Sequence, residues 1–563
     1  MLPNKTAIAM QNVEVIIENT QETISVPCGT PILDIAKQYR HIAQYPIIGA
    51  LVNNKIEDLN YCIYTPRTVQ FFDLSDKTFG YRVYIHSLAF MLYKAVCDTY
   101  PKAQLDVIQS LTNGYYCTIT GTDANQIDIA ATVRKRMMEL VEADLPFTST
   151  PTPMAKARNI IAETGNEETE KLLGSVGQLY TTIQRLGDTP HKINCKLVPS
   201  TSYLKLWDFR IFSDGYLLQF PNFENPSLLS LYKETPRMFN IFKEHHDWRK
   251  LLHISFVNDL NEAVREGRAI DVIHVSEALH EKKYSTIADA IHQRRDNVKV
   301  VLLAGPSSSG KTTSCRRLGV QLSVLGYDVQ QVSLDDYFID REKTPRQPNG
   351  DFDFEALEAL NIPLLNEHLL QLSEGREVEI PTYNFIKGKS EFLGKKIKLG
   401  KNSILIMEGI HALNPKLTEQ VPDELKFKVA VSPFTQISID NQNLIHTSDN
   451  RMIRRIVRDY NFRGYSAYET LKRWGSVRDG ERKHIFPYQE NADIFFNSGL
   501  LYELGVLKTY AEPLLERVPQ DKPEYAEAHR LRNFLALFEP ISPKHIPPTS
   551  IMREFLGDSS FEY

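Results

Sequence analysis

Short apolar runs separated by polar or turn-forming segments open the chain, which is the pattern of β-strands. The runs begin near residues 13, 23, 47 and 68. A Pro-Cys-Gly-Thr turn precedes the segment 31–36, which is typical of the first turns of a helix. Together these features predict a small β-grasp-like domain over residues 1–75.

Residues 76–285 mix helical and strand-like segments, which predicts an α+β domain. Within it, the segment 145–154 reads LPFTSTPTPM and is rich in proline and threonine. We expect this segment to be an exposed connector, because such clusters mark loops between regular elements.

Strand-like apolar runs alternate with helical segments from residue 286 to residue 500. The runs are 298–304, 328–334, 403–408 and 426–432. A helix is expected from Lys311 to Leu325. This alternation is typical of the α/β class, in which a parallel sheet carries helices on both faces. Residues 501–563 are expected to form a C-terminal helical tail.

The composition indicates a soluble protein with several domains. The 563 residues include 42% hydrophobic residues and carry a formal net charge of −5, with no apolar stretch of membrane-spanning length. This net charge argues against a protein that coats polyanions, although it permits local basic patches. The six cysteines form no CxxC pair, and the first residues lack a signal-peptide pattern. We therefore expect a reduced, cytoplasmic protein without membrane association.

A phosphate-binding loop follows the first apolar run of the α/β region. Residues 305–312 read GPSSSGKT and fit GxxxxGK[ST] at every fixed position, between a predicted strand and a predicted helix. Backbone N–H groups of such a loop face phosphates, its lysine reaches the β- and γ-phosphates, and its threonine binds Mg²⁺. We therefore expect ATP and Mg²⁺. The expected nucleotide-binding residues are Gly305, Ser307, Ser308, Ser309, Gly310, Lys311, Thr312 and Thr313.

Two acidic residues stand where later strands end. Asp335 follows the run 328–334, and Glu408 closes the run 403–408. Sheets of the α/β class bind ligands at the carboxyl ends of their strands. Phosphoryl transfer needs a carboxylate that takes the proton of the acceptor hydroxyl, and the carboxylates of Asp335 and Asp336 stand where such a group is expected, with Lys311 on the phosphates. Thr312, Asp335 and Glu408 form the predicted Mg²⁺ site.

Five arginines cluster further along the chain. Arg451, Arg454, Arg455 and Arg458 have i, i+3, i+4, i+7 spacing and share one face of a helix, and Arg463 follows. Such a face can close over a triphosphate and neutralise its charge during transfer. The alternatives are a solvated basic helix and an RNA-facing patch.

Six segments resemble the uridine kinase and phosphoribulokinase-like P-loop kinases, in that family's order. They are GPSSSGKTT, SLDDYF, DFDFEA, IPTYNF, IMEGI and RRIVRDYNFRG. The resemblance implies ATP-dependent phosphorylation of a primary hydroxyl, usually the 5′-hydroxyl of uridine or cytidine. The arginine segment resembles the lid of these kinases, which favours a catalytic role for Arg458 and Arg463.

The same resemblance implies roles for individual residues. Asp335 matches the acid–base carboxylate, and Thr312 and Glu408 match the magnesium-side residues. Asp353 of DFDF matches a ribose-contacting aspartate, and Tyr383 of PTYNF matches an aromatic residue beside the nucleobase. We place Phe385 of the same motif in the substrate site.

Two positions depart from the family pattern. Gly388 stands where a histidine of the base pocket is usual, and Tyr465 stands where an arginine usually follows RG. Both departures concern nucleoside recognition, and the loss of a polar contact there changes discrimination strongly. Asn384 or Lys387 is a candidate for the missing contact. We therefore expect uridine or cytidine first, with a different small hydroxyl acceptor as the alternative.

The front half resembles parts of threonyl-tRNA synthetases. VPCGTPILDIA and ALVNN resemble the TGS domain, while YIHSLAFML and HISFVNDLNEAV resemble the second additional, editing domain. Editing domains carry HxxxH and CxxxH motifs, but here Phe90 replaces the second histidine and no cysteine is followed by histidine four residues later. A metal needs about four donors. We therefore expect neither zinc at His86 nor editing activity.

Over its whole length the chain resembles bacterial TGS-containing uridine kinase-like nucleoside kinases. We expect the front half to be a binding, regulatory or dimer-forming module, and the protein to be a homo-oligomer. A nucleotide-regulated tRNA- or ribosome-binding protein is the rival interpretation, motivated by the TGS-like segment and the arginines. The negative net charge and the paired strand-end acids weigh against this RNA-binding role.

Overall fold

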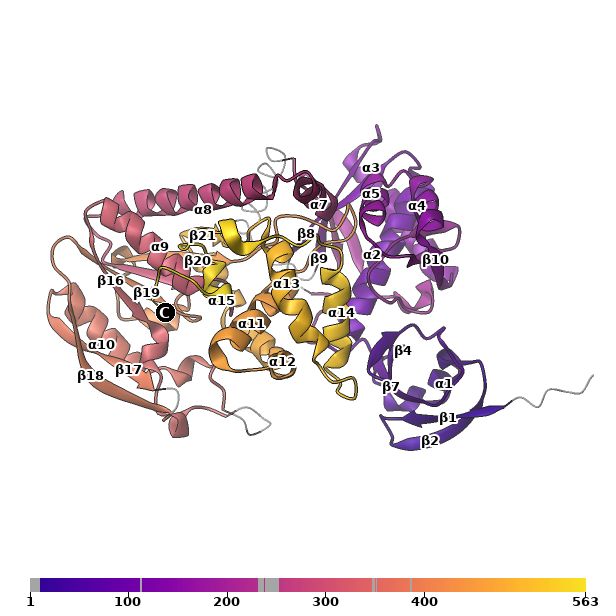
Figure 1. Cartoon of the computed structure of the whole chain (residues 1–563), viewed down its shortest axis with the longest axis horizontal. Helices are drawn as coiled ribbons and strands as arrows, with labels where there is room; N and C mark the ends of the chain where they lie inside the picture. Colours follow the sequence, from indigo (N-terminus) through magenta and orange to yellow (C-terminus); the bar gives the residue numbers. More distant parts are fainter. Residues whose placement is uncertain are drawn as a thin grey trace, which may run out of the picture.

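Three units follow one another along the chain in the computed structural model (Figure 1). The structure describes residues 11–111, 114–230, 253–346, 352–384 and 387–562, together with the single positions 237 and 350. Within these residues, no helix combines the length and the apolar character needed to cross a membrane.

The N-terminal unit is a five-stranded sheet with one α-helix. Its elements are β1 (Asn12–Ile17), β2 (Glu22–Pro27), β3 (Thr30–Pro31), α1 (Ile32–Gln38), β4 (Ile47–Val52), β5 (Lys55–Glu57), β6 (Cys62–Ile63) and β7 (Arg67–Asp73). The strand order is β2-β1-β7-β4-β5. Alternate residues of β1 are buried, and Val15 and Ile17 share a core with Ile32 and Ile35 of α1. The apolar runs form the strands they predict, while a relationship to TGS domains stays a prediction.

The middle unit combines two antiparallel sheets with helices. Its elements are α2 (Gly80–Thr99), β8 (Gln104–Leu111), β9 (Gly114–Thr120), α3 (Gln126–Glu142), β10 (Phe147–Pro153), α4 (Met154–Ala162), α5 (Glu167–Ser175), β11 (Tyr180–Leu186), β12 (Thr189–His191), β13 (Asp208–Phe212) and β14 (Gly215–Gln219). One sheet has the order β13-β14-β9-β8, and the other has the order β10-β11-β12. Leu88, Val133 and Leu218 meet in its core. A relationship to synthetase editing domains stays a prediction.

The proline- and threonine-rich segment 145–154 is largely a strand, so its prediction as a connector is wrong. β10 pairs antiparallel with β11 from Phe147 to Pro153. It lies at the edge of its sheet, and most of its side chains face solvent. Pro151 and Pro153 are tolerated because an edge strand has an unpaired side, where a missing N–H costs nothing. Exposure on this edge is why the segment lacks the apolar pattern of a strand.

The C-terminal unit is built on a parallel sheet, as the sequence predicts, and its five strands are one more than the four predicted runs. Its strands are β15 (Val300–Ala304), β16 (Asp328–Ser333), β19 (Ser403–Glu408), β20 (Lys426–Ser432) and β21 (Ile494–Asn497), in the order β16-β19-β15-β20-β21. Every pairing is parallel. Glu408 lies in register with Leu303 on one side and Ser333 on the other. The carboxyl ends of the central strands therefore meet at one edge.

Both faces of this sheet are covered. On one face, α8 (Ala269–His292) and α9 (Lys311–Val324) share a core with strand residues such as Val301 and Ile406. On the other face, α10 (Ile362–Ser373) and the hairpin of β17 (Glu377–Asn384) and β18 (Lys389–Lys398) pack near Leu302 and Leu405. Burial on both sides explains why the three central strands, β19, β15 and β20, read as largely apolar runs, while the edge strand β16 is mostly half-buried and contains polar residues.

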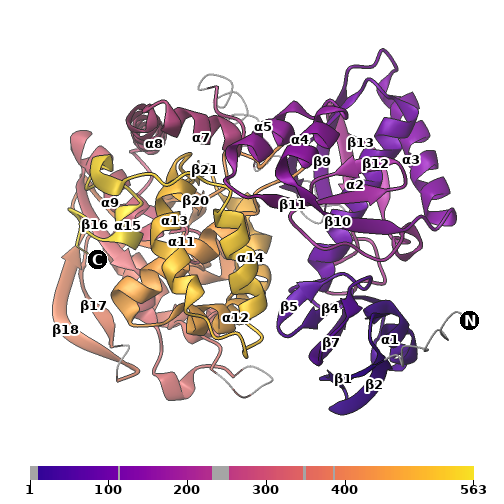
Figure 2. The ribbon, with the colours of Figure 1, turned by 45° about the vertical axis from the view of Figure 1, so that its right-hand side comes forward.

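The C-terminal helices belong to the same unit. They are α11 (Thr447–Arg463), α12 (Ala467–His484), α13 (Glu503–Glu516), α14 (Tyr525–Leu535) and α15 (Arg553–Leu556). Figure 2 shows α13 and α14 in yellow against α11, and Ile453, Leu507 and Leu531 share one core with α7 (Val257–Arg265). Ile551 and Phe555 are buried beside the sheet. The helices expected over residues 501–563 thus complete the packing around the sheet.

Hydrogen bonds join the middle unit to the C-terminal unit next to α11. The backbone N–H of Val107 in β8 donates to the carbonyl oxygen of Asn441 at 2.7 Å. The hydroxyl of Thr169 in α5 donates to Asp440 at 2.9 Å. Helix α11 therefore begins at the junction between the two units.

Candidate active site

The predicted phosphate loop connects β15 to α9, and two of its glycines are required by close contacts. A Cβ at Gly305 would overlap the backbone carbonyl of Val431. Gly310 has a φ of +81°, and a Cβ there would lie 2.7 Å from Cγ2 of Ile551. A side chain at either position would displace the neighbouring chain. The loop therefore fits its surroundings only with glycine at both ends.

Three of the predicted residues meet at the carboxyl edge of the sheet. The hydroxyl of Thr312 donates to Oε1 of Glu408 at 3.1 Å, and Nζ of Lys311 donates to the carbonyl of Pro306 at 3.2 Å. Burial lowers the pKa of Lys311, although Glu408 and Asp335 oppose this shift. Burial also raises the pKa of Glu408 to about 7, despite the charge of Lys311. These residues form a tight, partly compensated charge cluster.

Asp335 joins this cluster from the neighbouring strand. It lies in the 3₁₀ turn Leu334–Tyr337 directly after β16, and its backbone N–H donates to Oγ of Ser333 at 3.2 Å. Burial raises its pKa, while the charges of Lys311 and Arg463 lower it. The structure therefore brings Asp335, Lys311 and Glu408 together, as their places after strands predict.

The arginine helix α11 contacts the phosphate loop directly. Nε of Arg451 donates to the carbonyl of Ser307 at 2.9 Å, and Arg455 donates to the hydroxyl of Ser307 at 3.0 Å. Glu481 of α12 accepts from the backbone N–H of Ser307 at 3.1 Å and pairs with Arg451. The helix thus holds one side of the loop in place.

Arg454 has a structural role within the arginine cluster. It is fully buried, and its guanidinium pairs with Glu503 at 2.5 Å and donates to the carbonyl of Ser498 at 2.8 Å. Helical spacing places Arg454 on the same face as Arg458, but it does not reveal that this face changes from buried to partly exposed along the helix.

We expect Arg454→Ala to destabilise the C-terminal unit by about 3–5 kcal/mol, because it leaves Glu503 buried without its partner. Urea denaturation followed by tryptophan fluorescence measures this loss. Arg473→Ala on the exposed face of α12 is the matched control and should shift the transition little. Equal stability of the two variants would contradict this role for Arg454.

Arg458 and Arg463, the two arginines predicted to be catalytic, gather on Asp459. Arg458 pairs with Asp459 at 2.7 Å, Arg455 pairs with it at 3.1 Å, and Arg463 lies 3.8 Å from it. Arg463 also acts electrostatically on Asp335, so the two groups are near one another. The buried Asp459 therefore collects three cations near the phosphate loop. Sequence reasoning missed it, although it stands within the RRIVRDYNFRG segment.

An acidic residue from the C-terminal segment contacts the first turn of α9. Oε2 of Glu554 accepts hydrogen bonds from Oγ1 of Thr313 at 2.7 Å and from its backbone N–H at 3.2 Å. The first turn of a helix attracts anions, because its N–H groups have no partners within the helix. Glu554 therefore occupies a position where the sequence predicts phosphate. Glu554 is 241 residues from Thr313 in the sequence, and no local sequence pattern predicts the contact between them.

The predicted substrate-binding residues lie near the β17–β18 hairpin. Tyr383 is buried in β17, and its ring lies 5.5 Å from that of Phe338, which follows Asp335 closely in the chain. Oδ1 of Asp353 accepts from the backbone N–H of Glu355 at 3.2 Å. Phe385 lies outside the described residues.

Glu355, from the DFDFEA segment, was missed by the sequence reasoning. Burial raises its pKa, while Arg455 and Lys311 oppose this shift. The helix α12 approaches closely at this point, since a Cβ at Gly480 would lie 2.6 Å from Cβ of Glu355. Glu355 therefore adds a fourth carboxylate, with Asp335, Glu408 and Glu554, to the electrostatic surroundings of Lys311.

The space beside Gly388 is filled by Arg341. Gly388 has a φ of +68°, and a Cβ there would lie 2.9 Å from both Cβ and Nε of Arg341. The backbone N–H of Arg341 donates to the carbonyl of Gly388 at 2.8 Å. Lys387 instead pairs with Glu391 at 3.0 Å, and Asn384 accepts from the N–H of Lys387 at 3.0 Å. Arg341 is thus a further candidate where the sequence departs from the kinase pattern.

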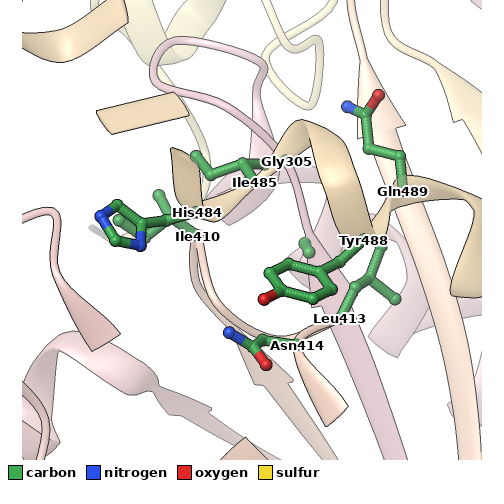
Figure 3. Close-up of a pocket in the computed structure, with 9 residues that line it drawn as sticks. Gly305, Ile410, Leu413, Asn414, His484, Ile485, Tyr488 and Gln489 are labelled. Carbon is green, nitrogen blue, oxygen red and sulfur yellow. The ribbon is translucent and has the colours of Figure 1, made fainter. Parts of the chain in front are cut away.

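A narrow pocket adjoins the phosphate loop on its Gly305 side (Figure 3). Its walls come from Gly305, from the segment after β19 and from the end of α12, including Leu413 and Tyr488. The walls leave no space for a water molecule between them. The pocket is therefore too closely packed to hold a nucleoside.

His86 lies in α2, far from the phosphate loop in the sequence. Its contacts are those of a histidine packed inside the protein. Its Nδ1 lies 2.9 Å from the carbonyl of Arg82, and its ring lies 5.8 Å from that of His446. Burial lowers its pKa to about 4, so the ring is neutral near pH 7. Among the described residues, no group of three or more metal-binding side chains surrounds it.

Comparison with known proteins supports the kinase interpretation for part of the chain. Residues 300–500 match the Phosphoribulokinase / Uridine kinase family. A uridine kinase of Schizosaccharomyces pombe is 31% identical over 196 residues, which cover 34% of this chain and 37% of that protein. Uridine-cytidine kinase B of Dictyostelium discoideum is 26% identical over 201 residues, which cover 36% of this chain and 74% of that protein.

Among solved structures, a possible uridine kinase from Bacillus stearothermophilus is 19% identical. The match covers 37% of this chain and 100% of the Bacillus stearothermophilus chain, with a TM-score of 0.24.

The parallel sheet, the phosphate loop and the family match define residues 300–500 as a P-loop kinase domain, a phosphotransferase with an alcohol acceptor. Within that class, the two named relatives are a uridine kinase and a uridine-cytidine kinase. Both matches span about a third of this chain, and the first spans little more than a third of the Schizosaccharomyces pombe protein.

Proposed function

We propose that this protein is a nucleoside kinase that transfers the γ-phosphoryl group of Mg-ATP to the 5′-hydroxyl of a nucleoside, with uridine and cytidine as the first candidates. The observation that carries the proposal is the meeting of Lys311, Glu408 and Asp335 at one sheet edge, beside a phosphate-binding loop. The named relatives support a nucleoside as the acceptor.

The loop residues fit the phosphates of ATP. The hydroxyls of Ser308 and Ser309 are buried, and neither has a hydrogen-bond partner in the described part of the chain. A buried polar group without a partner is costly, and phosphate oxygens would supply the missing acceptors. Lys311 would hold the β- and γ-phosphates, and the N–H of Thr313 would face the α-phosphate.

The oxygen donors nearby fit Mg²⁺. This ion prefers oxygen ligands and keeps several waters, so one or two carboxylates beside the phosphates suffice. Thr312, Glu408 and Asp335 supply a hydroxyl and two carboxylates at the loop. When bound, Mg²⁺ neutralises charge on the phosphates. We infer that these three residues hold it.

Asp335 is the proposed general base. Its carboxylate accepts the proton of the acceptor hydroxyl while the new oxygen–phosphorus bond forms, the bond to the terminal phosphorus of ATP breaks, and ADP leaves. Burial raises the pKa of Asp335 toward the working pH, which suits a base. The opposing charges of Lys311 and Arg463 favour its ionised, proton-accepting form.

Arg458 and Arg463 are the proposed partners of the transferring phosphoryl group. Asp459 gathers both guanidiniums, together with Arg455. Charges that are positioned in advance stabilise a transition state without the cost of reorganisation. Asp459 is therefore a positioning residue in this proposal.

The acceptor pocket is proposed to include Tyr383, Asp353 and Arg341. Tyr383 offers a ring for a nucleobase, Asp353 offers a carboxylate for ribose hydroxyls, and Arg341 fills the space over Gly388. A guanidinium at this place presents hydrogen-bond donors in a planar fork. It can therefore replace a histidine as the donor toward a base carbonyl.

Glu554 is expected to weaken nucleotide binding, because its carboxylate competes with phosphate for Thr313. We expect Glu554→Gln to lower the Kd for ATP about 5- to 30-fold, the effect of roughly 1–2 kcal/mol at a helix N-terminus. Calorimetric titration measures this change. Asp558→Asn, at an exposed position of the same segment, is the control and should leave the Kd unchanged. Weaker ATP binding by Glu554→Gln would contradict the competition.

The proposed function is tested with a panel of ribonucleosides, deoxyribonucleosides and other small hydroxyl compounds, each assayed for ADP release with Mg-ATP. Preferential phosphorylation of uridine or cytidine supports it, and mass spectrometry identifies the phosphorylated position. If only a non-nucleoside were phosphorylated, the proposed acceptor would be wrong, while the proposed phosphoryl-transfer chemistry would still hold. Salt-sensitive tRNA binding without phosphorylation of any compound would overturn the proposal in favour of an RNA-binding role.

A further inference from the structure

A large cavity lies between the middle unit and the C-terminal unit, next to the carboxyl end of β20, and neither Asp335 nor Glu408 lines it. Its volume is about 660 Å³ and it is open to solvent. Small-molecule sites typically have roughly 300–1,000 Å³. Helix α2 and strand β8 line one side, while α11, α12 and the segment before α11 line the other. The cavity is large enough for a ligand of the size of a nucleotide.

Aromatic side chains form much of the middle-unit wall. Tyr81 and Phe223 make an edge-to-face contact with ring centroids 4.8 Å apart, and Tyr115 stands against Phe220 at 4.7 Å. The guanidinium of Arg482 lies 3.6 Å from the centre of the Phe223 ring. Tyr115 and Phe220 are almost fully buried, so Tyr81 and Phe223 present the accessible part of this wall. Aromatic side chains bind flat, unsaturated rings through their faces and edges.

The opposite wall contains an arginine whose pairing differs from that of its neighbours. In the described part of the chain, the structure gives Arg478 of α12 neither a hydrogen bond nor an ion pair. The other arginines of the cavity are paired, since Arg82 binds Glu527 at 3.0 Å and Arg482 binds Asp479 at 2.9 Å. Arg451 pairs with Glu481. Arg478 is thus set apart from its neighbours.

The acids near Arg478 are already engaged. Asp449 and Glu527 act on it electrostatically, but Arg530 pairs with both of them, at 2.7 Å and 2.6 Å, and Arg82 contacts both as well. The negative charges of Asp449 and Glu527 are therefore balanced by Arg82 and Arg530, without a contribution from Arg478. Burial, with the charges of Arg482 and Arg82, lowers the pKa of Arg478 to about 10. The wall therefore carries an uncompensated positive charge that an anion would stabilise.

We propose that this cavity binds a small ligand in which an anionic group, a phosphate or a carboxylate, is joined to a planar ring, and that Arg478 pairs with the anion. The planar fork of a guanidinium matches two oxygens of either group. The aromatic wall receives the ring. The site uses neither the strand-end acids nor Lys311, although two of its lining residues, Arg451 and Glu481, also contact Ser307 of the phosphate loop.

UMP is the probe, because it joins a phosphate to a planar ring, while uridine and inorganic phosphate provide each part alone. Calorimetry on the full chain without ATP is expected to show a UMP site whose Kd rises at least about 30-fold in Arg478→Gln, the usual cost of removing one member of a buried charge pair. Uridine and inorganic phosphate are each expected to bind this site at least about tenfold more weakly than UMP. Arg473→Gln on the exposed face of α12 should leave UMP binding unchanged.

Several outcomes would overturn the proposal. The unaltered protein could bind no UMP, or Arg478→Gln could bind UMP as tightly as the unaltered protein does. UMP held only in the acceptor pocket would persist in Arg478→Gln, so failure of this site and failure of the proposed kinase function are distinguishable. Arg478→Lys keeps the charge without the fork and is expected to restore part of the affinity. Unchanged thermal unfolding and ATP binding verify that the variants are folded.

Discussion

Asp335→Asn is expected to lower kcat for phosphoryl transfer about 10²- to 10⁴-fold, the usual contribution of a positioned general base. Asparagine keeps the size of the side chain but cannot take the proton of the acceptor hydroxyl. The affinity for ATP should change far less, because the phosphate loop and Lys311 stay in place. Steady-state ADP release with the acceptor found in the panel measures the effect.

The matched control is Asp328→Asn. Asp328 begins the strand that Asp335 follows, so it lies at the opposite edge of the sheet, where it accepts a hydrogen bond from Ser403 at 2.8 Å. The same chemical change there should leave kcat within about twofold, as is usual for sites away from the chemistry. If both variants had the same kcat, another group would take the proton.

Lys311→Ala is expected to lower kcat/KM for ATP about 10²- to 10³-fold, the usual cost of removing one preorganised donor from a transition state. The lysine is the cation that faces Glu408 and Asp335 at the loop. Without it, these two carboxylates would repel the incoming phosphates. Initial rates over a range of ATP concentrations separate the effect on binding from the effect on turnover.

Lys299→Ala provides the comparison for Lys311→Ala. Lys299 stands just before β15, at the end opposite the phosphate loop, and Nζ of this half-buried residue donates to the carbonyl of Lys401 at 3.1 Å. Its replacement should leave kcat/KM within about twofold. Full activity of Lys311→Ala would show that the loop does not act on a nucleotide, and the kinase proposal would fail.

The parallel sheet was predictable from the sequence mainly because its three central strands, β19, β15 and β20, are buried on both sides, whereas the edge strand β16 is mostly half-buried. β15, β16, β19 and β20 lie within the predicted apolar runs, differing by at most two residues at one end. Exposed strands gave no such pattern. β10 carries prolines on a sheet edge, and most side chains of β18 face solvent, so neither has a continuous apolar run. Strands with buried side chains were therefore predicted more reliably than strands with exposed side chains.

The candidate site was predictable where its residues stand directly after strands. Asp335, Glu408 and the phosphate loop each follow an apolar run, and parallel pairing brings these ends together. Contacts between distant segments had no such pattern. The packing of Arg341 over Gly388 and the bonds from Thr313 to Glu554 depend on tertiary structure alone.

The contact between Ile551 and Gly310 has a consequence for the order of events during protein synthesis. Ribosomes add about 5–20 residues per second, and domains generally fold from the N-terminus onward. The 241 residues between Thr313 and Glu554 therefore take roughly 10–50 s to emerge. During that interval the phosphate loop exists without the segment that packs against it. A nascent chain would thus complete its nucleotide site late. A messenger RNA truncated before codon 551 would yield a protein whose phosphate loop lacks the segment that packs against Gly310.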